Sequence, residues 1–350
     1  MKVCADSIIF GLQNVGGIST YWLQLLQGLQ RHPDVDPSIR LGRTSRNTDA
    51  LAHVGSENII SYDWLPTAAA RYLPISSGRS DILHSSYYRL PHTFDHARLV
   101  TTVYDFIYER YVTGAAQTVH TAQKSFAIGR ADVILCISHS TRADLLERYP
   151  AIDPKRAIVT HLSYDRDTFH PISPELVDHA LERTALFVGA RNGYKRFDLA
   201  IAAIEQLCDV QLAIVGSPLS AEEHDLLEAH LPGRWRALGR LHNDALRIAY
   251  ASCLALIYPS DYEGFGLPLL EAMACGAPVV TNRGSSLGEV GGEAPVYATE
   301  QAGSAYAQAL STLSSPEARA ATVMRGFARC ATFDWQRTID ETVAAYRLIA

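Results

Sequence analysis

The hydrophobic pattern of the chain alternates between two kinds of segment. Short, uninterrupted apolar runs, typical of buried strands, are followed by longer segments in which apolar residues recur every three to four positions, as in amphipathic helices. In the first half this pattern predicts strands at residues 2–9, 82–84, 99–104, 133–137 and 157–160. It predicts helices around residues 19–30, 117–129 and 141–148.

The alternation starts again in the second half. Strands are predicted there at residues 185–188, 211–215, 236–238, 253–258, 277–281 and 294–297. Alternating strands and helices indicate parallel sheets with helices on both faces. Periodicity is interrupted near residues 165–181, where HPISPE occurs. The predicted fold class is therefore α/β, with two Rossmann-like domains facing each other across a cleft and ligands at the carboxyl ends of the strands.

Length, charge and cysteine usage narrow the class of protein. A chain of 350 residues is long for one core and natural for two domains. Its net charge of −6 argues against nucleic acid as the main partner. The six cysteines are scattered without a C-x-x-C pair, which indicates a reducing compartment. Because no apolar run approaches the ~18 residues that span a bilayer and no signal peptide follows Met1, we expect a soluble, cytoplasmic protein, at most attached to a membrane face.

The candidate chemistry is concentrated in residues 258–281, YPSDYEGFGLPLLEAMACGAPVVT. Gly264 and Gly266 permit a tight turn and a close approach of a ligand to the main chain. The proline that follows suits the first turn of a helix, whose free N–H groups and dipole favour an anion such as a diphosphate. Glu263 precedes the turn and Glu271 lies about one helical turn beyond it. One carboxylate could therefore hold the nucleoside and the other a sugar.

Two glutamates eight positions apart are by themselves more often solvated surface acids. Here the glycines, the proline and the flanking apolar strands agree with a binding turn, which favours the functional interpretation. The segment 263–279 resembles the signature EGFG-L-P-x-x-E-A-M-A-x-G-x-P-V of the retaining glycosyltransferases of family 4, which have the GT-B fold. Further resemblance covers nearly the whole chain, at residues 15–21, 137–140, 187–197, 238–250, 285–294 and 333–346.

The resemblance implies a domain arrangement and a reaction. It implies an acceptor-binding domain at residues 1–170, a nucleotide-sugar-binding domain at 171–332 and a C-terminal helix at 333–350 that packs back on the first domain. The reaction implied is transfer of a sugar from a nucleotide donor to a hydroxyl group with retention of anomeric configuration. Attack on the front face, assisted by the leaving phosphate, is implied because no carboxylate of the first domain is an evident nucleophile.

A departing nucleoside diphosphate needs its developing charge neutralised. Arg191 and Lys195 lie in the loop after the predicted strand 185–188. In similar enzymes an arginine and a lysine of this loop bind the diphosphate, and Lys195 matches the lysine directly. Many relatives place the arginine six residues before the lysine, where this chain has Gly189. Arg196 is interpreted as a solvent-exposed cation.

Gly16 and Gly17 form a second candidate anion site just before a helix. The pair belongs to neither a Walker loop nor a dinucleotide fingerprint, since G-K-[ST] and G-x-G-x-x-G are both absent. A lone GG turn is more often a packing feature, but the resemblance implies that it contacts the donor phosphates. Further donor-binding residues implied by the resemblance are Gly189, Gly239, Arg240, Leu241, Gly264, Phe265, Gly266 and Leu267.

Tyr104 and Asp105 end a predicted strand where relatives commonly carry His-Asp. Tyrosine in place of the histidine suggests an altered sugar pocket or weakened catalysis, while Asp105 could still meet the acceptor or donor sugar. His84 and Tyr87 could line the acceptor side, and each could equally be a packed core residue. In Ser138-His139-Ser140 we expect a helix cap by Ser140 rather than a catalytic base.

Two D-x-D triplets, at residues 34–36 and 165–167, could suggest a metal. We interpret the first as part of a proline-rich loop and the second as a turn in the linker, and expect no metal and no cofactor. Glu289 in SSLGEVGG could face the sugar or ribose, or could equally be an acid at a helix N-terminus.

The sequence thus predicts a metal-independent retaining glycosyltransferase with catalytic roles for Glu263, Lys195, Arg191 and Asp105. GDP-mannose is the first choice of donor and a glycan or lipid-linked glycan the expected acceptor, in bacterial surface polysaccharide or lipopolysaccharide synthesis. UDP- and dTDP-sugars are alternatives, as is a catalytically weak nucleotide-sugar-binding subunit. An epimerase would not be expected to carry EGFG-x7-E with the YKR loop, and a dehydrogenase needs the missing glycine fingerprint. Residues 64–79, an ordinary surface loop in most proteins, could touch the inner membrane face. The oligomeric state is not set by the sequence.

Overall fold

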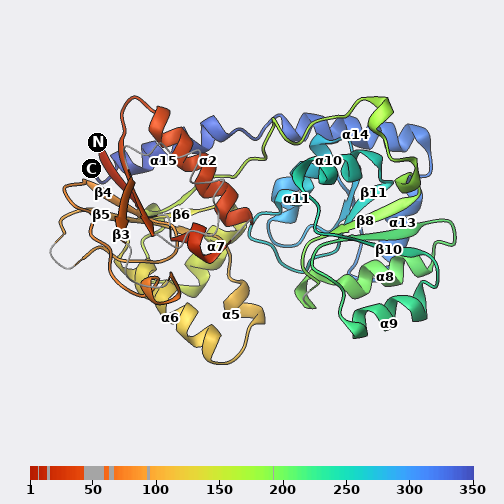
Figure 1. Ribbon diagram of the computed structural model, residues 1–350, viewed down its shortest axis with the longest axis horizontal. Helices are drawn as coiled ribbons and strands as arrows, with labels where there is room; N and C mark the ends of the chain where they lie inside the picture. Colours follow the sequence, from red (N-terminus) through yellow and green to blue (C-terminus); the bar gives the residue numbers. More distant parts are fainter. Residues whose placement is uncertain (7, 14–15, 43–58, 63–66, 93–94, 192) are drawn as a thin grey trace. The chain divides into compact units, whose positions relative to one another are not determined.

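The computed structural model describes the chain except for residues 7, 14–15, 43–58, 63–66, 93–94 and 192 (Figure 1). The chain divides into two compact units. The N-terminal unit comprises residues 1–162 together with 334–350, and the C-terminal unit comprises residues 163–333.

The N-terminal unit is built on a seven-stranded sheet with the order β3-β2-β1-β4-β5-β6-β7. Neighbouring strands all pair in parallel. The strands are β1 (Lys2–Asp6), β2 (Asp36–Gly42), β3 (Ile59–Tyr62), β4 (Ile82–Ser85), β5 (Arg98–Val103), β6 (Val133–Cys136) and β7 (Ala157–Val159). The helices are α1 (Ile9–Leu12), α2 (Gly17–Arg31), α4 (Thr67–Ala70), α5 (Ile107–Tyr111), α6 (Ala115–Arg130), α7 (His139–Arg148) and α15 (Trp335–Arg347).

Continuous apolar sequence explains the central strands of this sheet. All residues of β4 and β6 are buried, as expected for parallel strands covered by helices on both faces. The predicted strand at residues 2–9 is too long, because β1 ends at Asp6 and a short helix begins at Ile9. Strands β2 and β3 were not predicted, and β2 begins at Asp36, inside the triplet interpreted as a loop.

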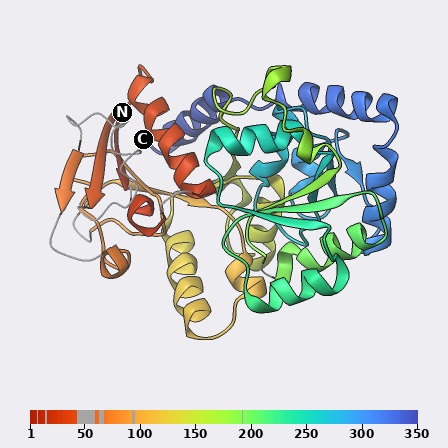
Figure 2. The ribbon, with the colours of Figure 1, turned by 45° about the vertical axis from the view of Figure 1, so that its right-hand side comes forward.

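The last helix of the chain completes the N-terminal unit. Helix α15 lies alongside α2 in both views (Figure 1, Figure 2). Gly28 of α2 makes this approach possible, since a Cβ atom there would lie 1.9 Å from Cδ1 of Ile339. Thr338 donates a hydrogen bond to the carbonyl of His161 at 2.6 Å, and Asp334 caps the helix by accepting from the Gln336 N–H at 2.9 Å.

The C-terminal unit is built on a six-stranded parallel sheet with the order β10-β9-β8-β11-β12-β13. The strands are β8 (Thr184–Val188), β9 (Gln211–Val215), β10 (Trp235–Gly239), β11 (Ala255–Tyr258), β12 (Val279–Thr281) and β13 (Val296–Tyr297). The helices are α8 (Phe197–Glu205), α9 (Ala221–His230), α10 (Asn243–Ser252), α11 (Leu267–Ala274), α12 (Leu287–Gly291), α13 (Gly303–Thr312) and α14 (Pro316–Cys330).

The core of the C-terminal unit lies between this sheet and helices α8 and α13. Phe187 of β8 packs edge-on against Phe197 of α8, with 4.9 Å between ring centroids. Helices α8 and α13 approach closely because a Cβ atom on Gly303 would lie 2.6 Å from that of Ala202. All six strands predicted for this half are present. Among the described residues of both units, no helix has the length and hydropathy needed to cross a bilayer.

Candidate active site

The strand order of the C-terminal unit marks where a ligand should bind. The chain proceeds from β8 outward through β9 to β10, then returns to β11 on the other side of β8 and continues to β13. In open parallel sheets, ligands bind outside the carboxyl ends of the strands at the position where the order reverses. That position lies between β8 and β11, and the loops after these two strands carry Lys195 and Glu263.

Lys195 and Glu263 form a short ion pair at this position. Nζ of Lys195 lies 2.5 Å from Oε1 of Glu263 and also donates to the Tyr258 hydroxyl at 3.0 Å. The two side chains are only 13% and 9% exposed. Burial, with the charge of Glu263 as a second cause, holds the pKa of Tyr258 well above its usual range, so its hydroxyl stays neutral. The structure thus brings together the two residues that the sequence assigned to charge neutralisation and sugar binding.

The glycine turn before α11 has the backbone conformation that its sequence predicts. Gly266 precedes the helix in the left-handed region, with φ of 98°, and Pro268 is the second helical residue. Two serines that the sequence analysis did not assign support the turn. Ser285 Oγ accepts from the Glu263 N–H at 2.9 Å, and Ser286 Oγ donates to the carbonyls of Glu263 and Phe265 at 3.0 and 2.9 Å.

Glu271 lies in a different environment from Glu263. It is the fifth residue of α11, and its Oε2 accepts from the Tyr250 hydroxyl of α10 at 3.3 Å. Burial raises the pKa of the Glu271 carboxyl to about 7; the Tyr250 hydrogen bond opposes this shift and the charge of Asp165 adds to it. The two carboxylates therefore have separate partners, as two different ligand contacts would require, and the ribose role of Glu271 stays a prediction.

Three glycines lie side by side where β8, β9 and β10 end. The Gly189 N–H donates to the carbonyl of Val215, and the Gly216 N–H donates to that of Gly239, both at 2.9 Å. Gly189 and Gly239 have φ of 122° and 68°, and a Cβ atom on either would meet open space. The main chain at Gly189 and Gly239 is thus uncovered by side chains, as the predicted donor contacts require, whereas a Cβ atom on Gly216 would lie 3.3 Å from Nη1 of Arg191. The two residues after this edge are the exposed Arg240 and the half-buried Leu241.

Arg191 is held inside the C-terminal unit rather than presented to a ligand. Its guanidinium donates to Glu223 of α9 at 2.7 and 3.0 Å and to the carbonyl of Pro218 at 2.8 Å. The side chain is only 5% exposed. Its Nη1 atom has no hydrogen-bond partner but is buried, and the Lys195 side chain is more exposed, at 13%, which makes Lys195 the better-placed candidate cation.

In the N-terminal unit the strand order reverses between β1 and β4. Gly16 and Gly17 follow β1 and α1 and begin α2, as predicted. The Gly16 N–H donates to Ser19 Oγ at 2.9 Å, and that hydroxyl donates back to the Gly16 carbonyl at 2.9 Å. The pair therefore forms a helix start, and its contact with donor phosphates stays a prediction.

His84 is a core residue, which confirms the packed-core alternative and excludes the place on the acceptor side. Its ring nitrogens contact the Tyr346 hydroxyl of α15 at 2.6 Å and the Thr102 hydroxyl at 2.8 Å, and the side chain is fully buried. Burial lowers the pKa of His84 to about 3, which keeps the imidazole neutral. Both ring nitrogens are occupied by the fold itself.

Tyr104 is also turned into the core. Its hydroxyl accepts from the Trp22 indole N–H at 2.6 Å and donates to the carbonyl of Ser86 at 2.8 Å. It is 4% exposed and does not line an acceptor surface of the described residues. The tyrosine that replaces the family histidine is therefore a packing residue in this chain.

Asp105 and Tyr87 are half-buried, and their contact with the acceptor stays a prediction. Asp105 Oδ1 accepts from the Ile107 N–H at 2.9 Å, and the Asp105 carbonyl accepts from the buried Lys124. The Tyr87 hydroxyl lies 3.1 Å from Nε2 of His120. Burial lowers the pKa of His120 to about 4, with further lowering by the nearby cations, so this ring is neutral.

Three minor predictions have clear outcomes. Helix α7 is capped by Ser138, whose Oγ accepts from the Thr141 N–H at 3.0 Å, and not by Ser140. Asp165 is a turn residue as predicted, accepting from the Asp167 N–H at 3.1 Å and from the Thr168 hydroxyl at 2.5 Å. Glu289 lies in the first turn of α12, in agreement with the helix N-terminal alternative.

Comparison with known proteins identifies the family. The family described as "Glycosyl transferases group 1" matches residues 174–324, and the family described as "Glycosyltransferase Family 4" matches residues 15–168. The chain is 30% identical over 289 residues to the O-antigen chain mannosyltransferase B of Escherichia coli, covering 77% of this chain and 74% of that protein. This chain belongs to glycosyltransferase family 4.

Solved structures show that this glycosyltransferase has the GT-B fold. Sucrose-phosphate synthase from Thermosynechococcus elongatus superimposes with a TM-score of 0.76 at 19% identity, covering 99% of this chain and 98% of that one. HepE from Anabaena, solved in complex with UDP and glucose, superimposes with a TM-score of 0.77 at 15% identity and covers 99% of both chains.

The sequence analysis missed several residues that organise the candidate active site of this glycosyltransferase. Tyr258 ends β11 inside an apolar run, and only its final position in that strand hinted that its hydroxyl would meet Lys195. Ser285 and Ser286 belong to the segment SSLGEVGG, whose resemblance to the family was noted. Their hydrogen bonds to the backbone of the EGFG turn were not predicted. Arg196, interpreted as a solvent cation, pairs with Asp198 and Asp261.

Proposed function

We propose that this glycosyltransferase moves a sugar from a nucleotide-sugar donor to a hydroxyl group of a glycan or lipid-linked glycan, with retention of anomeric configuration. GDP-mannose is the first choice of donor, since the E. coli relative bears the name of an O-antigen mannosyltransferase. The same relative supports a role in bacterial surface polysaccharide synthesis. The observation that carries the proposal is the ion pair of Lys195 and Glu263 where the strand order reverses.

The proposed mechanism assigns different parts of the donor to different side chains. The Lys195 ammonium stabilises the negative charge that develops on the leaving diphosphate. Glu263 accepts hydrogen bonds from hydroxyl groups of the transferred sugar, and Glu271 accepts those of the ribose. The acceptor hydroxyl attacks from the face that the diphosphate leaves, and a phosphate oxygen takes its proton. Asp105 of the N-terminal unit is proposed to contact the acceptor.

We propose that the reaction needs no metal or other cofactor. One acid of each D-x-D triplet serves local structure: Asp165 caps its own turn, and Asp34 pairs with Arg347. Neutralisation of the diphosphate is assigned to Lys195 instead.

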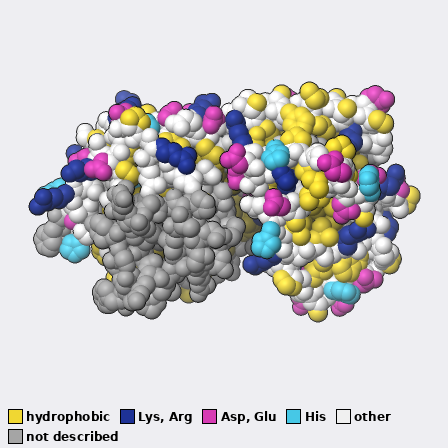
Figure 3. Space-filling model, turned by 45° about the horizontal axis from the view of Figure 1, so that its top comes forward, with side chains coloured by type: hydrophobic (Ala, Val, Ile, Leu, Met, Phe, Trp, Pro, Cys, Tyr) yellow, Lys and Arg dark blue, Asp and Glu magenta, His cyan; other side chains and the backbone are white. Residues whose placement is uncertain are grey.

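Surface charge does not favour nucleic acid as a partner. On the face drawn in Figure 3, cationic and anionic side chains are interspersed over the described surface, without the continuous basic stripe typical of nucleic-acid-binding proteins. We further propose a cytoplasmic location, peripheral at the membrane face. Tyr72 and Leu73 are 50% and 43% exposed beside Arg71, whereas Trp64 and Leu65 of the same segment lie outside the described residues.

A UDP-sugar is the main alternative donor, because HepE was solved with UDP and glucose. A catalytically weak binding subunit is the second alternative, because Tyr104 replaces the histidine common in relatives and is buried against Trp22. Both alternatives keep the nucleotide-sugar site. The first differs from the proposal in the nucleotide base of the donor, and the second in the rate of sugar transfer.

A panel of nucleotide sugars tests the proposal. Ligands that bind the native state raise the melting temperature in proportion to RT ln(1 + [L]/Kd). We expect GDP-mannose to give the largest shift and to be slowly hydrolysed, and NMR of the product to show the anomeric configuration of the donor. A larger shift with UDP-sugars would select the alternative donor, binding without hydrolysis would select the silent subunit, and no shift with any nucleotide sugar would overturn the proposal.

A further inference from the structure

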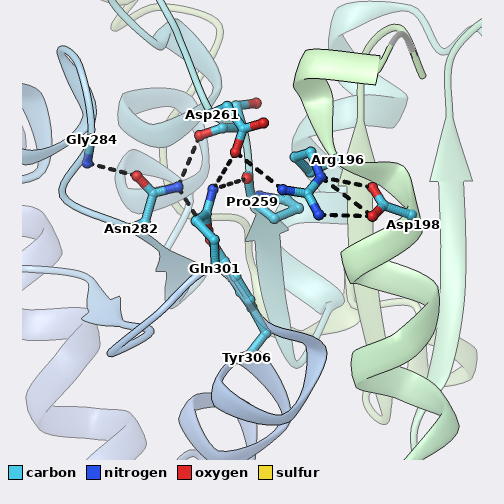
Figure 4. Close-up of polar contacts among 9 residues, drawn as sticks. Arg196, Asp198, Pro259, Asp261, Asn282, Gly284, Gln301 and Tyr306 are labelled. Carbon is cyan, nitrogen blue, oxygen red and sulfur yellow. Dashed lines mark hydrogen bonds and ion pairs between the residues drawn. The ribbon is translucent and has the colours of Figure 1, made fainter.

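A polar network joins four loops at the carboxyl edge of the C-terminal sheet (Figure 4). The loops follow β8, β11, β12 and β13, which are separate in sequence. The network does not include the side chains of Lys195 and Glu263. Two of its members lie close to them in the sequence, since Arg196 follows Lys195 and Asp261 lies two residues before Glu263. The principal members are Arg196, Asp261, Asn282, Gln301 and Tyr306.

Asp261 connects the loop of Glu263 to the loop of Lys195. It lies two residues before Glu263, and its backbone N–H donates to the carbonyl of Tyr194 at 2.8 Å. Its Oδ1 lies 3.3 Å from Nη1 of Arg196. Asp261 is therefore bonded to both sequence neighbours of Lys195, so a shift of one loop is transmitted to the other.

Gln301 fixes the position of the Asp261 carboxylate from the opposite side. Its side-chain N–H groups donate to Asp261 Oδ1 at 2.7 Å and to the carbonyl of Pro259 at 3.0 Å. Its carbonyl oxygen accepts from the Tyr306 hydroxyl. Burial raises the pKa of Tyr306 to about 12, so this hydroxyl stays protonated and sets the direction of the Gln301 amide.

Asn282 extends the same network to the loop that supports Glu263. Its amide group donates to the carbonyl of Ser260 at 2.8 Å and to the Tyr306 hydroxyl at 3.1 Å, and its carbonyl accepts from the Gly284 N–H at 2.6 Å. The next residue is Ser285, whose Oγ accepts from the Glu263 N–H at 2.9 Å. The backbone of Glu263 is thus held through Asn282 and its carboxylate through Lys195.

We propose that Asp261 is a positioning residue, which together with Gln301 and Asn282 sets the distance between Lys195 and Glu263. The inference rests on the function proposed above, in which these two side chains contact the donor. A misplacement of about 1 Å in a catalytic group can lower a rate ~100-fold, so a network that aligns two loops is a determinant of turnover. The network itself contacts the pair through backbone and neighbouring residues and does not touch the donor.

Two substitutions of Asp261 separate positioning from charge. Asp261→Asn keeps an oxygen that accepts from Gln301 and removes only the charge opposite Arg196, in a half-buried pair. Asp261→Ala removes both contacts. We expect Asp261→Ala to lower kcat at least tenfold with a smaller change in donor KM, and Asp261→Asn to keep kcat within about threefold of wild type. Asp225→Ala, on the exposed side of α9, is the matched control with unchanged kinetics.

A double-mutant cycle tests whether Asp261 acts through Lys195. If it does, Asp261→Ala should have little further effect in a Lys195→Met background, whereas independent residues would give additive losses. Additive losses, an unchanged kcat in Asp261→Ala, or an equal loss in Asp261→Asn would each overturn the inference.

The pair can also be observed without turnover. The sequence contains four lysines, Lys2, Lys124, Lys155 and Lys195. Reductive methylation with ¹³C-formaldehyde therefore gives a simple NMR spectrum, in which Lys195→Arg identifies the Lys195 signal. We expect Glu263→Gln and Asp261→Ala to shift this signal and Asp225→Ala to leave it unchanged; an unshifted signal in Asp261→Ala would overturn the inference. If wild-type protein used no nucleotide sugar, the proposed function would fail while this measurement would still decide the role of Asp261.

Discussion

Lys195 and Glu263 are separated by 68 positions in the chain, yet Nζ of the lysine lies 2.5 Å from Oε1 of the glutamate. Each comes from the loop after one of two adjacent parallel strands, β8 and β11. The pair therefore results from the strand order, and it places one positive and one negative group at the same end of the sheet. Both are available to a ligand that has an anionic part and a hydroxyl-rich part.

Replacement of Lys195 by methionine should reduce turnover. The substitution removes the hydrogen-bond donor proposed to stabilise the leaving diphosphate, and loss of one such donor typically lowers kcat ~10²- to 10³-fold. Steady-state kinetics at saturating donor measures the effect, with Lys155→Met on the exposed surface of the N-terminal unit as the control. A normal kcat in Lys195→Met would show that the lysine does not stabilise the transition state.

Donor affinity should depend on pH through Glu271. Its pKa of about 7 means that the carboxyl is ionised above neutrality and protonated below it, and the ionised form is the better acceptor for ribose hydroxyls. Binding therefore weakens as the pH falls. Between pH 8 and pH 6 we expect an increase of about tenfold in the Kd of GDP-mannose, as the ionised fraction falls.

Calorimetric titration at several pH values measures this effect. A nucleotide sugar is the suitable ligand because its diphosphate is ionised throughout this range. Glu271→Gln supplies the control, since it cannot titrate and should bind weakly with the same Kd at pH 6 and pH 8. An equally pH-dependent Kd in Glu271→Gln would assign the effect to another group.

The N-terminal unit should lose stability in acid because of His84. Its pKa is about 3 in the fold and 6.5 in the unfolded chain, so the unfolded state binds the extra proton between these values. The free energy of unfolding therefore falls as the pH drops below about 6.5, by up to ~1.4 kcal/mol per pH unit for this one group.

Thermal melting between pH 7 and pH 4 tests the contribution of His84. His84→Gln should melt at a lower temperature than wild type at pH 7, since hydrogen bonds to Tyr346 and Thr102 are disturbed. Its melting temperature should then fall less steeply with acid. Part of the slope remains because His120 also has a lowered pKa, about 4. Parallel slopes in the two proteins would contradict the assignment to His84.

Gly28→Ala should destabilise the contact between α2 and α15. The added Cβ would lie 1.9 Å from Cδ1 of Ile339, and forcing an extra carbon into a packed contact costs about 1–3 kcal/mol. The double variant Gly28→Ala with Ile339→Ala should recover part of the loss, because the clashing atoms are removed. Gly129→Ala is the matched control, a helical glycine whose Cβ would meet open space. Equal melting temperatures for the two alanine variants would contradict the steric argument.

The fold could be predicted from the sequence wherever apolar runs were continuous. Strand β9 has the predicted bounds, and α2 extends one or two residues beyond its prediction at either end. Strand β2 was missed because the polar residues of DPSIRLG conceal a strand at the edge side of β1, and strand β3 was missed although two of its four residues are isoleucine. A hydrophobic pattern indicates which residues are buried, and the polar residues of β2 interrupt that pattern.

The part of the candidate site that depends on short segments of sequence was predicted, and the part that depends on distant contacts was not. Glu263, Lys195 and the glycine turn belong to a local signature, so their positions at strand ends follow from short segments. His84 and Tyr104 could not be assigned in this way. Whether such a side chain faces a substrate or the core depends on distant partners, here Tyr346 of α15 and Trp22 of α2. Arg196 was set aside for the same reason, since Asp261 lies 65 positions away.

The position of α15 in the sequence determines the order in which the two units can complete their folding. Residues 163–333 form one continuous stretch, so the C-terminal unit has all of its chain before synthesis ends. The N-terminal unit, although it emerges first from the ribosome, lacks the hydroxyl of Tyr346 that binds His84 until the last helix appears. We therefore expect chains truncated after Phe333 to contain a protease-resistant segment at residues 163–333 and none at residues 1–162.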